Sequence, residues 1–121
     1  MDKLSFSLES YLDAVYELSA GGGGARLTDI ARRMNVTKST ASAAMNSLAE
    51  RGFITNERYK NIFLTSDGIA LASEVTKKHE TILKYLTDVL GINPDVADVD
   101  ACAIEHIVSR DVVNAMKKAL R

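Results

Sequence analysis

Apolar residues recur at every third or fourth position through the first part of the chain, a spacing typical of helices with one buried face. The pattern predicts a first helix over about residues 7–18 and a second over about 27–34. A third helix is expected from a cap at Thr37 or Ser39 to about residue 51. The second and third helices are short and joined by a tight turn, which is typical of a helix-turn-helix unit.

The periodicity changes over residues 54–64, where two short apolar segments flank a charged turn. We expect two strands here, forming a β-wing with Arg58 and Lys60 at its tip. A long helix begins at Thr65 or Ser66, and one or two further helices cover about residues 94–120. One face of the long helix is expected to carry Ile69, Ala72, Val75, His79, Ile82, Leu83, Leu86, Val89 and Leu90.

The predicted fold is therefore mainly α with a small β-wing. A winged helix-turn-helix domain is expected in residues 1–65 and an α-helical domain in residues 66–121. No run of about 18 apolar residues and no signal-peptide core are present, so we expect no membrane association. The single cysteine cannot form an internal disulfide, which fits a reducing cytoplasm.

The charge distribution indicates where nucleic acid would bind. The net charge is −1, but residues 26–60 contain seven basic and three acidic side chains between two acidic segments. Short hydroxyl side chains at the start of a recognition helix suit the major groove and nearby phosphates. The expected DNA contacts are Thr37, Ser39, Thr40 and Ser42 to bases and phosphates, with Lys38, Arg58 and Lys60 to the backbone. Alternatively, the hydroxyls only cap the helix or face solvent.

The motif Cys102-x-x-Glu105-His106 places a thiol, a carboxylate and an imidazole within five residues. At positions i, i+3 and i+4 these side chains are expected on one face of a helix. His79, on the preceding helix, could approach the same point, which would assemble a transition-metal site between helices. The alternative is a partly buried polar patch with an inert cysteine.

With the winged helix-turn-helix in front of this motif, the chain resembles the DtxR/MntR family of metal-dependent transcriptional repressors. The resemblance runs from Leu8-Glu9-Ser10-Tyr11-Leu12 through Leu64-Thr65-x-x-Gly68 to Glu105-His106-x-x-Ser109. It implies a regulator without enzymatic activity, which represses metal-uptake genes when its metal-loaded dimer binds a double-stranded DNA operator. The helical domain would then hold the metal and the dimer contact.

The resemblance also implies a ligand set. His79, Cys102, Glu105 and His106 fall on family ligand positions. From the first helix, Ser10 stands where the family has a stronger ligand, and Asp13 stands where its manganese branch has a glutamate. A second site of the iron branch is weakened here, although Asp98 could still contribute an oxygen.

The donor types rank the expected metals. A thiolate at Cys102 favours softer ions over manganese, so iron(II) is expected first and manganese(II) second. Zinc(II), cobalt(II) or nickel(II) are expected to bind in vitro. Low pH should oppose binding, because histidine and cysteine must lose their protons to ligate.

A homodimer is expected because the last helices have more apolar surface than a small domain can cover by itself. The residues concerned are Ile104, Ile107, Val108, Val112, Val113, Met116 and Leu120. Two other functions stay open. One is a winged-helix regulator without metal sensing, whose Cys102 region forms a dimer interface or a thiol sensor. The other is a zinc hydrolase, which is disfavoured because no HExxH pair is present.

Overall fold

The computed structural model describes residues 4–19, 23–57 and 61–120. They belong to two compact units, Met1–Ala72 and Ser73–Arg121. The boundary falls inside the long helix α4 (Ser66–Lys84). The domain division expected at residue 65 lies at the start of the same helix and stays a prediction.

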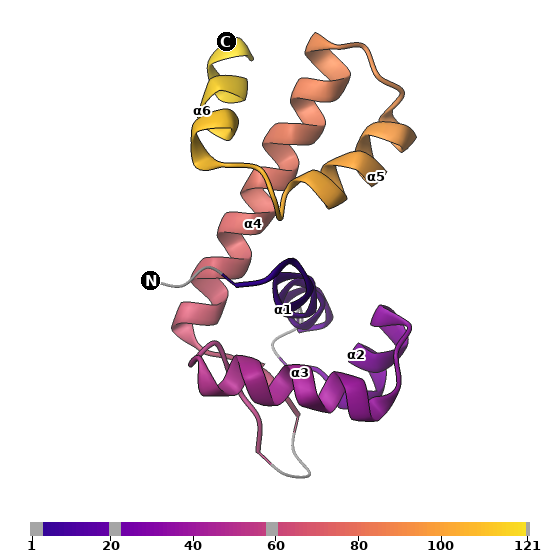
Figure 1. Ribbon diagram of the computed structural model, residues 1–121, viewed down its shortest axis with the longest axis vertical. Coiled ribbons are helices and arrows are strands. Elements are labelled where there is room, and N and C mark those ends of the chain that lie inside the picture. The colour runs from indigo at the N-terminus through magenta and orange to yellow at the C-terminus, as the bar shows by residue number, and fades with distance from the viewer. Residues whose placement is uncertain (1–3, 20–22, 58–60, 121) are drawn as a thin grey trace. The chain divides into compact units, whose positions relative to one another are not determined.

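Three helices build most of the first unit: α1 (Phe6–Leu18), α2 (Leu27–Met34) and α3 (Lys38–Glu50) (Figure 1). All three pack against one another. The Ser5 hydroxyl caps α1 by accepting the Leu8 N–H at 3.2 Å. The predicted bounds are correct to within one residue, because caps and apolar periodicity are local signals. The centre of this core includes Leu12, Val15, Ile30, Met45 and Leu48.

Two residues, Asn35 and Thr37, form the turn between α2 and α3. Asn35 adopts the left-handed conformation, with φ 57°, and so ends α2. Thr37 then caps α3, its Oγ1 accepting the Thr40 N–H at 3.1 Å. The expected helix-turn-helix is thereby confirmed.

The wing is a two-stranded antiparallel sheet of β1 (Ile54–Thr55) and β2 (Phe63–Leu64). Ile62, just before β2, pairs instead with Ala25, with both backbone hydrogen bonds at 2.8 Å. This bridge joins the wing to the segment that leads into α2. The register pairs Ile54 with Leu64 and Thr55 with Phe63.

Hydrogen bonds and a close backbone contact connect the base of the wing to the end of α3; we call this group of contacts the joint. Thr65 donates its N–H to Phe53 O at 3.0 Å and its hydroxyl to Gly52 O at 2.6 Å. The same hydroxyl oxygen accepts the Gly68 N–H at 3.1 Å. A Cβ on Gly68 would lie 2.0 Å from Phe53 O, so only glycine fits there. This contact accounts physically for the Leu64-Thr65-x-x-Gly68 motif.

The second unit contains the rest of α4, the π-helical turn η1 (Tyr85–Val89), α5 (Pro94–Ile104) and α6 (Arg110–Ala119). The chain after η1 therefore forms two helices, and both pack against η1. Side chains of Asn93 and Ser109 cap α5 and α6. In the part of the chain that the structure describes, no helix has the length and apolar character needed to cross a bilayer.

The apolar face predicted for α4 is exposed at both ends. Ile69 is 50% exposed, because Gly68 occupies the inward row against the wing and turns its neighbour outward. Val89 and Leu90 are 45% and 53% exposed. The wider turn of η1 rotates them out of the stripe that a 3.6-residue period predicts.

Candidate functional site

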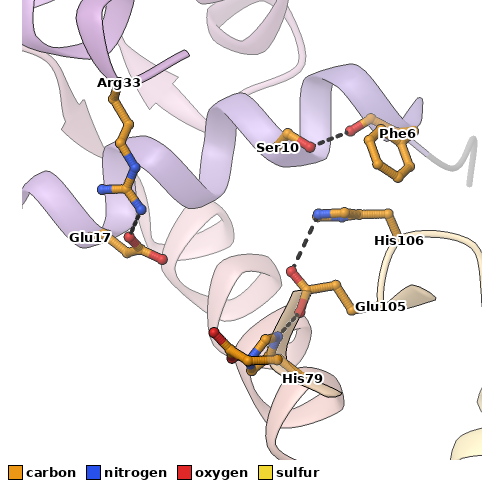
Figure 2. A network of polar contacts seen from close by, with 8 residues as sticks. Phe6, Ser10, Glu17, Arg33, His79, Glu105 and His106 are labelled. Atoms are coloured by element: carbon orange, nitrogen blue, oxygen red, sulfur yellow. Dashed lines mark hydrogen bonds and ion pairs between the residues drawn. The ribbon is translucent and has the colours of Figure 1, made fainter. Parts of the chain in front are cut away.

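Two imidazoles and one carboxylate meet in the second unit. His79, on α4, has Nδ1 2.6 Å from Oε2 of Glu105. The other carboxylate oxygen, Oε1, lies 3.3 Å from Nε2 of His106. Figure 2 shows Glu105 between the two rings. Glu105 and His106 are buried, so the contact between these two side chains has little access to bulk water.

The end of α5 supplies two of these three side chains. The helix stops at Ile104, and Glu105 is its C-cap, still donating its N–H to Ala101 O at 2.9 Å. The Ile107 and Val108 N–H groups both donate to Ile104 O and form the turn that follows. His106 therefore lies in a turn after the helix, where the backbone can present its ring to the carboxylate beside it.

The expectation that Cys102, Glu105 and His106 share one helical face is wrong for His106, which lies in the turn after α5. Cys102 is exposed, whereas Glu105 and His106 are buried. The i, i+4 rule assumes that the helix continues through the motif, and α5 ends before His106. The role of Cys102 as a ligand stays a prediction that rests on the family resemblance.

Asp98 of α5 contacts the other side of the His79 ring. His79 Nε2 lies 2.9 Å from Asp98 Oδ1, so each ring nitrogen faces a carboxylate. Burial by itself lowers the pKa of His79, but the hydrogen bond to Asp98 and the charge and hydrogen bond of Glu105 outweigh it. The net result is a pKa of His79 above its ordinary value of 6.5. The protonated ring is thus favoured between the two acids.

The donors fit a divalent transition metal. Two imidazoles and a carboxylate are ligands that iron, manganese and zinc accept. A ligating histidine commonly donates its second ring N–H to a carboxylate, which fixes the ring. His79 has a carboxylate at each ring nitrogen, Asp98 at Nε2 and Glu105 at Nδ1, so a metal bound on the Glu105 side would leave Asp98 to accept the Nε2 hydrogen.

Ser10 and Asp13 lie one turn apart on α1, in the first unit. The Ser10 hydroxyl donates to Phe6 O at 3.0 Å, one turn back in its own helix (Figure 2). Asp13 is half-buried. Their role as metal ligands stays a prediction.

The predicted DNA-contacting residues of α3 divide into two groups. Thr37 and Thr40 contact each other, their hydroxyl oxygens 2.9 Å apart, in addition to the cap bond. Lys38 and Ser39 are exposed at the first turn, and Ser42 is half-buried. The helix thus offers an exposed polar first turn, while two of its hydroxyls also hold its end in shape.

The basic charge of the first unit is partly neutralised by local partners. Arg33 of α2 forms an ion pair with Glu17 of α1 (Figure 2), and Arg32 lies 3.9 Å from Asp29. The sequence analysis missed the Arg33 pair, because no spacing rule links residues sixteen positions apart. Arg58 and Lys60, the expected wing contacts, lie outside the described residues.

A second contact missed from sequence joins α3 to the wing. Asn56, directly after β1, donates from Nδ2 to Oδ1 of Asn46 at 2.7 Å. Asn46 lies two turns beyond Ser39, on the same exposed side of α3. The spacing along α3 shows from sequence that Asn46 lies on the same side as Ser39. It does not show that Asn56 of the wing is the partner of Asn46.

Two family profiles together match most of the chain. Residues 3–62 match the profile described as the iron-dependent repressor N-terminal DNA-binding domain. Residues 65–121 match the one described as the iron-dependent repressor metal-binding and dimerisation domain. The chain belongs to the iron-dependent repressor family.

Individual relatives agree with this assignment. The transcriptional regulator MntR of Salmonella typhimurium is 33% identical over 108 residues, covering 89% of this chain and 68% of the relative. The iron-dependent repressor IdeR of Mycobacterium tuberculosis is 30% identical over 120 residues, covering 99% and 52%. The solved structure of the manganese regulator SloR has a TM-score of 0.79 and 29% identity, covering 93% and 53%. The chain thus spans about half to two thirds of the length of these relatives.

Family membership confirms the resemblance and the fold class derived from sequence. Iron-dependent repressors are metal-dependent transcriptional regulators with a DNA-binding domain and a metal-binding and dimerisation domain, and this chain matches both parts. The His79–Glu105–His106 group lies within the part matched to the metal-binding domain.

Proposed function

We propose that this protein is a divalent-metal-responsive repressor that binds a double-stranded DNA operator as a homodimer and controls metal-uptake genes. The observation that carries the proposal is the Glu105 carboxylate, whose two oxygens face the rings of His79 and His106. The exposed polar first turn of α3 supplies the surface that would contact DNA, and bound metal would change the affinity of this contact.

His79, Glu105 and His106 form the centre of the proposed metal site. Asp98 orients His79 from the far side of its ring, which supports a positioning role for this carboxylate more than a ligand role. A bound divalent ion would supply positive charge that offsets the carboxylates and would replace the proton held by His79. The family resemblance adds Cys102, Ser10 and Asp13 as candidate ligands.

Iron(II) is the metal proposed first and manganese(II) the second. The His79, Glu105 and His106 donors suit either ion, and a thiolate from Cys102 would favour iron. Among relatives, the names iron-dependent repressor IdeR and manganese regulator SloR include both metals. Zinc(II), cobalt(II) and nickel(II) are expected to compete in the test tube, because nitrogen ligands prefer them to manganese.

DNA binding is proposed for the start of α3 and the wing. Ser39 and Ser42 are the proposed contacts to bases and phosphates, together with Thr37 and Thr40, which also maintain the helix cap. Lys38, Arg58 and Lys60 are the proposed backbone contacts, which would make affinity depend on salt more than on sequence.

Metal can control DNA binding only if it binds the DNA-competent state more tightly than the alternative state. A coupling of about 1–3 kcal/mol corresponds to roughly 5–150-fold in DNA affinity.

The dimer is supported by exposed apolar side chains in the second unit, where Ile107 is 69% exposed and Val112 is 44% exposed.

The test selects duplexes from a random pool with iron(II) present, then measures their affinity by fluorescence anisotropy in iron(II), manganese(II) or EDTA. The wild-type protein should bind at least fivefold more tightly with metal. His106→Ala should lose most of the metal-dependent gain in DNA affinity while keeping its circular dichroism spectrum. Lys118→Ala on α6 should keep the metal-dependent gain. Equal affinity in EDTA and in both metals would reject the metal switch and favour a regulator that senses no metal.

A further inference from the structure

A cleft lies between α4 and α6 in the second unit, and His79, Glu105 and His106 are not among its lining residues. Its volume is about 170 Å³. One of its lining residues, Val113, is buried. The other lining residues are Glu74, Lys77 and Lys78 from α4 and Arg110, Asn114 and Lys117 from α6.

The lining is strongly basic. It contains four cationic side chains and one carboxylate, that of Glu74. Arg110 Nη2 lies 3.0 Å from Glu74 Oε1, but the two side chains are 77% and 47% exposed. An ion pair this exposed holds its partners only weakly, so the guanidinium can turn to another acceptor. Cations that converge on one cleft repel one another, and an anion among them removes that repulsion.

The size of the cleft limits the ligand. Pockets for drug-sized ligands measure roughly 300–1,000 Å³, well above the 170 Å³ found here. The planar donors of Arg110 and the point charges of the lysines match phosphate oxygens, and the Asn114 amide can donate one more hydrogen bond.

We infer that this cleft binds a small polyvalent anion of the phosphate type, such as inorganic phosphate or pyrophosphate. The site differs from the proposed DNA contacts, which lie on α3 and the wing, and from the proposed metal ligands, none of which lines the cleft. The protein would thus have a binding site for a second small ligand in addition to the metal.

Part of the positive charge of the cleft could serve only to stabilise the end of α6, and the chain provides a control for this role. Lys117 and Lys118 both lie in the last turn of α6, where positive charge stabilises a helix C-terminus. Only Lys117 lines the cleft. Replacing either lysine removes the same charge from the helix end, whereas only one replacement alters the cleft.

The experiment is isothermal titration calorimetry of pyrophosphate into metal-free full-length protein, in EDTA and at low salt. Lys117→Ala should weaken binding about three- to tenfold, while Lys118→Ala should stay within about twofold of wild type. Glu74→Gln should tighten binding about threefold, because it removes the competing carboxylate and releases Arg110. Thermal melts of each variant establish that it is folded.

Three outcomes would overturn the inference. The first is the absence of saturable binding to the wild-type protein. The second is an equal loss in Lys117→Ala and Lys118→Ala, which would indicate a general charge effect. The third is unchanged pyrophosphate binding in Lys117→Ala with a loss of affinity for duplex DNA, which would assign the cleft to the DNA backbone.

Discussion

The start of α3 and the end of α5 both present functional side chains, yet they are held in different ways. At α3, Thr37 and Thr40 are three residues apart, and their contacts form as soon as the helix does. At α5, Glu105 is held by His79, which lies 26 residues earlier on another helix. The first site is therefore a property of a local segment, and the second exists only when α4 and α5 pack together. Variants that separate local from long-range contacts can test this difference.

The largest effect is expected at the joint between α3, the wing and α4. Gly68→Ala would place a Cβ 2.0 Å from Phe53 O, a backbone atom that cannot move without opening the wing. We expect a loss of about 3 kcal/mol or more in the free energy of unfolding, measured by urea denaturation. Gly52→Ala is the control, because it meets no nearby atom and has only the strain of its positive φ, about 1–2 kcal/mol. Equal losses would show that the close contact at Gly68 does not matter.

Glu105→Gln tests the long-range group directly. The substitution keeps the size of the side chain but removes the charge that faces both imidazoles. Affinity for manganese(II) should fall about 100-fold or more, measured by calorimetry, because a ligand matters more than the 10–100-fold typical of its supporting residues. The variant should keep its DNA affinity in EDTA. Undiminished metal affinity would remove Glu105 from the proposed site.

Asp98→Asn should have a smaller effect, which depends on pH. Without metal, the raised pKa of His79 means that protonation stabilises the folded state below about pH 6.5, and this contribution is lost as pH rises through the raised pKa. Unfolding free energy of metal-free protein should therefore fall over that window in the wild type and less in the variant. Urea titrations at about pH 6 and pH 8 measure the difference.

Metal binding should show the opposite trend with pH. The metal must displace the His79 proton, so affinity rises as pH rises through the same window. Asp98→Asn should lower metal affinity about tenfold, because the ring loses its orienting carboxylate. A variant with wild-type affinity and an unchanged pH profile would argue against a positioning role for Asp98.

The smallest effect is expected at the local site. Thr37→Ala removes the cap of α3 and should cost about 1 kcal/mol of stability. Thr37→Ser keeps a capping hydroxyl and should restore most of it. If Thr37 also contacts DNA, Thr37→Ala should weaken operator binding by more than Thr37→Ser does, at matched salt. Equal binding by both variants would leave Thr37 with a capping role alone.

The sequence by itself determined the first three helices, the wing and the motifs that identify the family, because each of these depends on short-range signals. Ser5 and Thr37 cap helices, Asn35 ends one, and Gly52 follows the last turn of α3 with φ 82°. Such signals act within a few residues and can be read in order along the chain. The Leu64-Thr65-x-x-Gly68 motif was visible in the sequence, but its physical cause, the close approach of Gly68 to Phe53 O, was visible only in the structure.

Only the tertiary structure decided which polar side chains meet. It placed Asp98 and Glu105 on opposite sides of the His79 ring, joined Asn56 to Asn46, and brought the cations of α4 and α6 to one cleft. It also placed His106 in the turn that follows α5, since this helix ends within the motif. Spacing rules apply only while one helix continues, whereas contacts between helices depend on where each helix stops and how it packs.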